Sequence, residues 1–111
     1  MPWYEIPVKY MSIRSRVQLL NIEGRSFCLV FNDDKWVAFS KSCPHAGAPL
    51  VDGWCEDGQI VCPFHRHSLD LKTGRGKLGQ HNYIKIYPTK IEADRCLVYF
   101  GSSLWSRLFS K

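Results

Sequence analysis

The chain has 111 residues, of which 45% are hydrophobic and 23% charged, and its formal net charge is +5. This length is that of one ordinary domain, and the composition excludes a disordered chain. No run reaches the roughly 18 apolar residues of a membrane span, and the first residues lack the basic and apolar regions of a signal peptide. We therefore expect a cytoplasmic protein that does not enter a membrane.

Short apolar or alternating runs, bounded by turn residues, recur along the chain and predict an all-β fold. The first three runs are separated by turns containing Gly, Asn or Asp, and they predict two successive hairpins over residues 17–22, 26–31 and 35–40. Further strands are expected at residues 59–62, 68–71, 83–87 and 95–100. Near the C-terminal end, the pattern of residues 104–109 predicts a short helical turn with apolar side chains on one face. This face is expected to dock on the domain's own core, and the alternative is contact with a partner or a membrane surface.

Residues 41–80 differ in composition from the rest of the chain. They hold three of the five cysteines, three of the four histidines and six of the eight glycines. This density is typical of functional loops. We therefore predict one domain over residues 1–111, in which a loop subdomain of about residues 41–80 is inserted into a β base built as a small antiparallel sandwich or barrel.

Two short motifs in this segment each combine one cysteine with one histidine. Cys43 and His45 are separated by a proline, and Cys62 and His65 by a proline and a phenylalanine. Each proline fixes the backbone φ of a tight turn, so that a thiolate and an imidazole can be aimed at one point. Two such turns brought together predict a metal site with two sulfur and two nitrogen ligands. The alternative is that these are core cysteines and surface histidines that share no site.

The donor set by itself permits zinc or an iron–sulfur cluster. Zinc fingers commonly take two cysteines from one turn and two histidines from a helix, whereas each motif here supplies one of each. A Rieske centre has two histidines in place of two cysteines on one iron of a [2Fe–2S] cluster, and this arrangement favours one cysteine and one histidine from each loop.

With these residues the chain resembles the Rieske-type [2Fe–2S] ferredoxins, over residues 43–50 and 62–74 most clearly. The resemblance implies a Rieske-like all-β fold in which two loops carry the cluster. It also implies that Cys43 and Cys62 bind the inner iron, that His45 and His65 bind the outer one, and that the protein transfers one electron at a time.

Several positions depart from the respiratory and photosynthetic members of that family. Their extra loop cysteines, which form a disulfide, correspond to Ala48 and Phe64, and their serine and tyrosine hydrogen-bond donors correspond to His67 and Leu69. Loss of these donors predicts a low reduction potential, which suits a carrier supplied from NAD(P)H. Arg66 stands where oxygenase-type ferredoxins commonly have a glycine.

We therefore expect a monomeric electron carrier that is not an enzyme and that passes electrons from a reductase to a terminal oxidoreductase such as an oxygenase. The alternatives are a non-catalytic small subunit of an assimilatory nitrite reductase, a redox-sensing module or a structural zinc protein. No small-molecule substrate or nucleic acid is expected. We do not expect an oxygenase, because only His67 and His81 remain for a second iron and 111 residues leave no room for a catalytic domain.

The remaining side chains have simpler interpretations. Cys28 and Cys96 lie in apolar runs and are expected in the core, while Cys55 lies in a turn region and is expected to be an exposed thiol. The side chains of basic residues near the two motifs form either a solvated rim or a docking surface for an acidic partner; they are Lys41, Arg66, His67, Lys72, Arg75 and Lys77.

Overall fold

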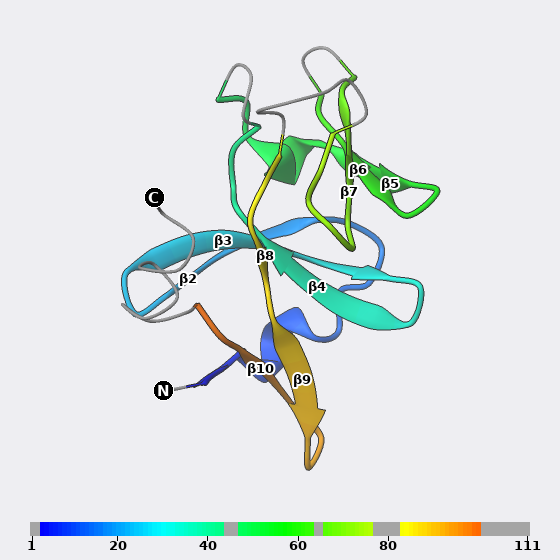
Figure 1. Ribbon diagram of the computed structural model, residues 1–111. Coiled ribbons are helices and arrows are strands. Elements are labelled where there is room, and N and C mark those ends of the chain that lie inside the picture. Colours follow the sequence, from blue (N-terminus) through cyan, green and yellow to red (C-terminus); the bar gives the residue numbers. More distant parts are fainter. Residues whose placement is uncertain (1–2, 44–46, 64–65, 77–82, 101–111) are drawn as a thin grey trace.

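The computed structural model describes residues 3–43, 47–63, 66–76 and 83–100. Their regular structure consists of short antiparallel strands and two single-turn 3₁₀ helices, η1 (Val8–Tyr10) and η2 (Leu50–Asp52). The strands form three sheets, so the predicted all-β class is confirmed (Figure 1). No helix in these ranges is long and apolar enough to cross a membrane.

The central sheet has the order β2-β3-β4-β8 and forms the middle of the molecule. Its strands are β2 (Gln18–Ile22), β3 (Arg25–Asn32), β4 (Lys35–Phe39) and β8 (Ile86–Tyr87). Its first two hairpins are those that the sequence predicts.

The other two sheets lie on opposite sides of the central sheet (Figure 1). The lower one has the order β1-β10-β9, with β1 (Tyr4–Glu5), β9 (Thr89–Glu92) and β10 (Arg95–Val98). The upper one has the order β5-β6-β7, with β5 (Trp54–Glu56), β6 (Gln59–Val61) and β7 (Ser68–Asp70).

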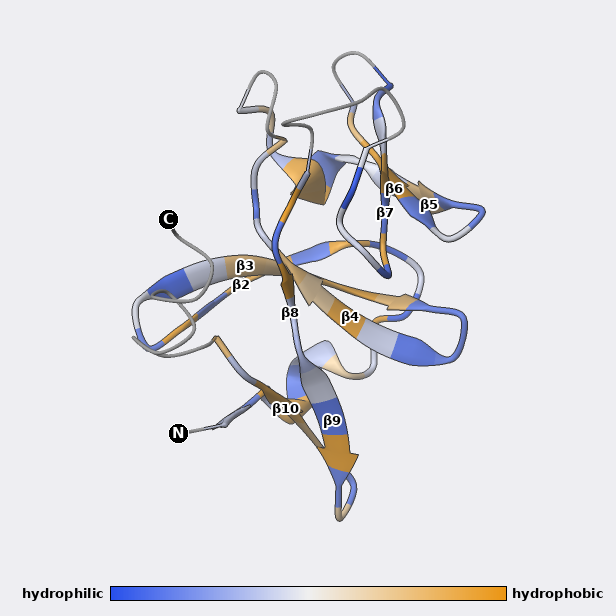
Figure 2. Cartoon of the chain, viewed as in Figure 1, coloured by the Kyte–Doolittle hydropathy of each residue, from blue (hydrophilic) through white to orange (hydrophobic). Residues whose placement is uncertain are grey.

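The core is divided between the two faces of the central sheet. Along β3, Phe27 and Leu29 belong to the lower core, whereas Cys28 and Val30 belong to the upper core. All four side chains are buried. A strand that is buried on both faces reads as a continuous apolar run rather than an alternating one, and the hydropathy colouring in Figure 2 follows this apolar band along β3.

Four hairpins turn through two residues that both have positive φ, as in type I′ turns, whose twist matches that of the strands. The turn residues are Glu23-Gly24, Asp33-Asp34, Asp57-Gly58 and Ala93-Asp94. Only the first and third of these pairs have the glycine that the second turn position favours.

The strand predictions hold within two residues at each end for the first three strands and for β6, β7 and β10. The prediction over residues 83–87 is wrong in part, because only Ile86–Tyr87 is a strand and Tyr83 forms an isolated bridge to Arg75. Strands β1, β5 and β9 were not predicted. The predicted turn at residues 104–109 lies outside the described residues.

Candidate metal centre

The two cysteines of the paired motifs are buried in the same part of the molecule. Cys43 follows the central sheet and is 2% exposed, and Cys62 follows β6 and is fully buried. Both belong to the upper core, together with Leu50, Ile60 and Leu69. The fold thus brings two thiols, 19 residues apart in sequence, into one apolar environment.

The two cysteines open loops that are closed by the same hydrogen bonds. In the first loop, residues 43–48, the Cys43 N–H donates to the Ala48 carbonyl at 2.8 Å, and the Gly47 N–H donates to the Cys43 carbonyl at 2.9 Å. In the second loop, residues 62–67, the Cys62 N–H donates to the His67 carbonyl at 2.8 Å, and the Arg66 N–H donates to the Cys62 carbonyl at 3.0 Å. Each is therefore a six-residue loop with a cysteine at its first position.

The fifth position of each loop has left-handed backbone geometry, with φ of 69° at Gly47 and 57° at Arg66. This reversal of the chain lets the amide of the fifth residue return to the cysteine carbonyl. The predicted ligands His45 and His65 occupy the third and fourth loop positions, and both lie outside the described residues. Within the described ranges, no three metal-ligating side chains gather into a site. Of the four predicted ligands, the described residues include the two cysteines.

A close backbone approach lies directly before Cys62. The turn of η2 follows that loop and ends at Gly53, and a Cβ added there would lie 2.2 Å from the carbonyl oxygen of Val61. Val61 directly precedes Cys62. The Leu50 N–H also donates to the Lys41 carbonyl at 2.9 Å, which fixes η2 to the chain entering the first loop.

These features fit a two-iron cluster held at two loops. Two thiols from matched loops are the number that one iron of a Rieske centre takes from the protein. Their burial keeps water from the sulfur side, which is a protein's means of setting the potential of such a centre.

Comparison with known proteins agrees with this geometry, because the Rieske [2Fe–2S] domain family matches residues 3–88, more than three quarters of the chain. The chain belongs to this Rieske family. The ferredoxin component of the naphthalene 1,2-dioxygenase system of Pseudomonas aeruginosa is 30% identical over 97 residues, which cover 86% of this chain and 93% of the relative. The ferredoxin subunit of anthranilate 1,2-dioxygenase from Burkholderia cepacia is 34% identical over 72% of this chain and 76% of the relative.

Solved Rieske structures share the fold at lower identity. The ferredoxin of carbazole 1,9a-dioxygenase from Nocardioides aromaticivorans superimposes with a TM-score of 0.76 at 22% identity, over 88% of this chain and 97% of that one. A protein assigned as the small subunit of an NADH-dependent nitrite reductase from Mycobacterium tuberculosis gives a TM-score of 0.79 at 18% identity, over 91% and 96%.

These matches confirm four of the sequence predictions. The fold is the Rieske fold, and the cofactor of this Rieske protein is a [2Fe–2S] cluster. The protein is an electron carrier and not a catalyst, in agreement with the ferredoxin components among its relatives.

The other three cysteines of this Rieske protein are separate from the two loops. Cys28 is fully buried in the upper core, where burial raises the pKa of its thiol to about 12, and Cys96 is buried in the lower core, where burial raises its pKa to about 11. The expectation of an exposed thiol at Cys55 is wrong in part. Cys55 lies in β5 and is half-buried, and this burial raises the pKa of its thiol.

The departures from the disulfide-containing branch are visible in the structure. All five cysteines lie in the described part of the chain and none forms a disulfide. Ala48 is buried at the end of the first loop, and the fully buried Leu69 places a hydrocarbon side chain where that branch has a tyrosine hydroxyl. No described residue of the second loop contributes a serine or tyrosine hydroxyl.

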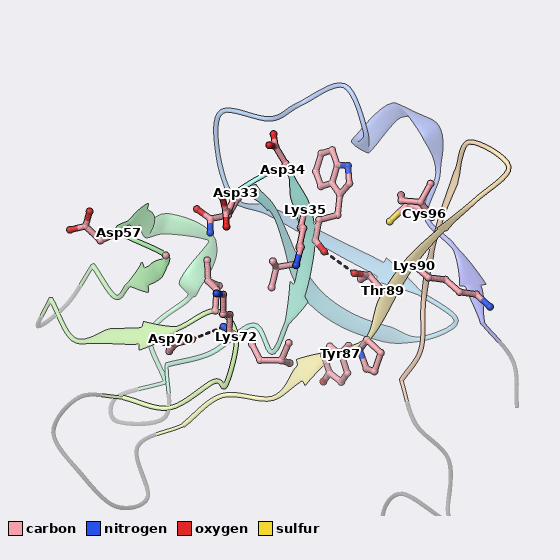
Figure 3. A pocket seen from close by; sticks show the side chains of 18 residues that line it. Asp33, Asp34, Lys35, Asp57, Asp70, Lys72, Tyr87, Thr89, Lys90 and Cys96 are labelled. Atoms are coloured by element: carbon pink, nitrogen blue, oxygen red, sulfur yellow. Dashed lines mark hydrogen bonds between the residues drawn. The ribbon is translucent and has the colours of Figure 1, made fainter.

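A groove of about 990 Å³ is lined by residues of the central, upper and lower sheets and by none of the described loop residues. Its lining includes four aspartates and three lysines (Figure 3): Asp33, Asp34 and Asp57 in hairpin turns, Asp70 at the end of β7, and Lys35, Lys72 and Lys90. The Thr89 hydroxyl donates to the Trp36 carbonyl at 2.7 Å there, and Asp70 Oδ1 accepts the backbone N–H of Lys72 at 2.6 Å. Both bonds lie within the groove, and the groove is separate from the described residues of the cysteine loops.

Proposed function

We propose that Cys43, His45, Cys62 and His65 hold the [2Fe–2S] cluster, the cysteines on the inner iron and the histidines on the outer one. The matched hydrogen bonds of the two loops support this assignment, because they place the two thiols in equivalent positions within one buried cluster. The bound cluster supplies a reversible one-electron carrier. The chain's own part is to enclose the two thiols in apolar side chains.

The role that these residues support best is that of a cytoplasmic, monomeric carrier that takes electrons from a reductase and delivers them to a terminal oxygenase. The observation that carries this proposal is the identity of 30% or more with ferredoxin components of dioxygenase systems over most of the chain. The five unbridged cysteines are consistent with a reducing compartment.

The small subunit of a nitrite reductase is the second candidate function. The fold match to such a subunit has 18% identity, and identity at this level carries the fold and not the role. The sequence relatives at higher identity therefore favour the oxygenase system.

The ligand assignment is tested by replacing the four residues one at a time and measuring iron per chain. Cys43→Ser, Cys62→Ser, His45→Ala and His65→Ala should each abolish the native two-iron content, because each removes one of four bonds to iron. Cys55→Ser is the matched control, since this half-buried thiol lies one strand away from Cys62 and is not a proposed ligand. A ligand variant with two irons and an unchanged spectrum would contradict the assignment.

The role is tested by purifying the protein from its own host. A carrier should elute at the size of a single chain and should be reduced by NADH only after a separate reductase is added. Copurification as a stoichiometric subunit of a large reductase would overturn the carrier role in favour of the second candidate.

A further inference from the structure

An exposed arginine and an exposed tryptophan stack beside Cys62. The guanidinium carbon of Arg66 lies 5.5 Å from the centre of the Trp54 ring, within the range of a cation–π interaction. Trp54 is 38% exposed and pairs across the β5–β6 hairpin with Val61, the residue before Cys62. The Arg66 amide donates to the Cys62 carbonyl. The backbone of Arg66 is therefore bonded to Cys62, a proposed cluster ligand, and the backbone of Trp54 lies opposite the residue before it.

The backbone at Arg66 is unfavourable for a residue with a side chain. Its φ of 57° is left-handed, and this costs a non-glycine residue about 1 kcal/mol. The first loop places Gly47 at the same position, with φ of 69°. The cation–π contact with Trp54 offsets part of this cost, since such contacts at exposed sites contribute about 0.5–1 kcal/mol. The second loop thus holds an arginine where glycine would be less strained.

The hydrogen-bond donors of Arg66 are available to a partner. The ion pairs among the described residues are Lys90–Glu92, Arg95–Glu5 and Arg95–Glu92, all in the lower sheet. Glu56, the acid next to Trp54, instead accepts the indole N–H at 3.4 Å. A guanidinium stacked on a ring keeps its in-plane N–H groups free to bind a carboxylate with two hydrogen bonds.

Within the two cysteine loops the formal charge has one source. In the sequence of both six-residue loops, 43–48 and 62–67, Arg66 is the only Asp, Glu, Lys or Arg. Arginine and tryptophan are also the residue types that most often dominate the affinity of protein interfaces.

We propose that Arg66 and Trp54 form a docking platform that binds a carboxylate on the surface of the redox partner protein. The platform places that partner against the second cysteine loop, where the electron leaves. This proposal rests on the proposed carrier function and adds to it the chemistry of the partner: an acidic surface around its own redox centre. The net charge of +5 on the whole chain has the same sign as this local charge and favours the same class of partner.

The test uses the full cluster-loaded chain and two surfaces of defined charge. Gold electrodes are coated with a carboxylate-terminated or an amine-terminated alkanethiol monolayer, and the rate of electron exchange is measured by voltammetry. The wild-type protein should exchange electrons faster on the carboxylate surface by about tenfold or more. Arg66→Glu should lose this preference, Arg66→Lys should lose most of it because the planar fork is gone, and Trp54→Ala should slow exchange severalfold.

The matched control is Arg14→Glu. Arg14 is also exposed and also lies over an aromatic ring, 4.5 Å from the centre of Phe31 in the central sheet, so its replacement makes the same change in charge and removes the same kind of contact. It should leave the preference within about twofold of wild type. If Arg14→Glu and Arg66→Glu lost the preference for the carboxylate surface equally, net charge alone would explain the effect and the platform would be overturned. An unchanged rate of electron exchange in Arg66→Glu would also overturn it.

Failure of the platform and failure of the carrier function are distinguishable. A solution redox titration of each variant reports the cluster without any surface. Full reduction and reoxidation in that titration, combined with no effect of Arg66→Glu on the carboxylate surface, overturns the platform alone. A wild-type chain with no redox couple in the titration overturns the carrier function.

Discussion

Replacing Gly53 with alanine should displace Cys62, one of the proposed cluster ligands, without touching it. The backbone of Gly53, with φ of −87° and ψ of −168°, is open to any residue, so the effect is one of space and not of conformation. The added Cβ would lie 2.2 Å from the Val61 carbonyl oxygen and 3.2 Å from that of Leu50. To reach an ordinary contact, the Val61 carbonyl would have to move by about 1 Å, because both groups are backbone and neither can rotate away.

We expect this forced shift to lower the free energy of unfolding by about 2–3 kcal/mol, at the upper end of the range for overpacking. In a domain of this length the melting temperature should fall by about 8–12 °C. The shift acts on the residue before Cys62, so the spectrum of the cluster should change as well. Thermal unfolding followed by circular dichroism, together with the electron paramagnetic resonance (EPR) signal of the reduced protein, measures both effects.

Gly58→Ala is the matched control in the same hairpin. Gly58 has a left-handed φ of 78°, and an added Cβ would meet nothing within 4 Å. Its replacement should therefore cost about 1 kcal/mol from conformation alone and leave the cluster signal unchanged. The reasoning is refuted if Gly53→Ala melts like Gly58→Ala, or if it loses stability while its EPR signal stays that of the wild type.

Three further predictions concern a turn, the buried thiols and the potential. Ala93→Asn combined with Asp94→Gly gives the β9–β10 turn the residues that type I′ geometry favours. In urea titrations this double variant should have a free energy of unfolding about 1 kcal/mol higher than that of the wild type. No gain in stability would contradict the turn assignment. Burial raises the pKa of Cys28 from 9.0 to about 12 and that of Cys96 from 9.0 to about 11. Because these thiols ionise first in the unfolded chain, the free energy of unfolding should be constant below pH 9 and should fall above it. Each thiol should contribute a decrease of up to about 1.4 kcal/mol per pH unit. Urea titrations from pH 8 to 10.5 test this, and a Cys28→Val variant with an equally steep decline would contradict it. Voltammetry should place the midpoint potential toward the lower end of the Rieske range of about −150 to +300 mV, and a value near the upper end would show that other donors replace the missing hydroxyls.

The sequence predicts the fold class because most strands keep a clear apolar signal. Residues 27–31 are apolar on both faces of β3, and the turns that flank this strand contain Gly24, Asp33 and Asp34, which are residue types common in turns. Strand β5 escapes prediction because Trp54, Cys55 and Glu56 are too few to show a pattern, and their pairing with β6 is what makes them a strand. Strand β9 has two exposed residues and follows a proline, so it has little apolar signal.

The loop motifs are visible in the sequence because the prolines and the Cys and His spacing are local. The backbone contacts that support the loops join residues of different elements, and no local sequence pattern indicates such contacts. Gly53 matters through its approach to Val61, eight residues further along the chain. The left-handed position of Arg66 is also hidden, because arginine does not signal positive φ as glycine does, and only the shared hydrogen-bond pattern with the first loop reveals it.

Metal analysis combined with EPR of the dithionite-reduced wild-type protein shows directly whether the chain holds a Rieske-type cluster. We predict two irons per chain and the EPR signal of a Rieske-type [2Fe–2S] centre, which differs from that of a four-cysteine cluster because histidines ligate one iron. Zinc without a paramagnetic signal, or the spectrum of a cluster with four cysteine ligands, would contradict it.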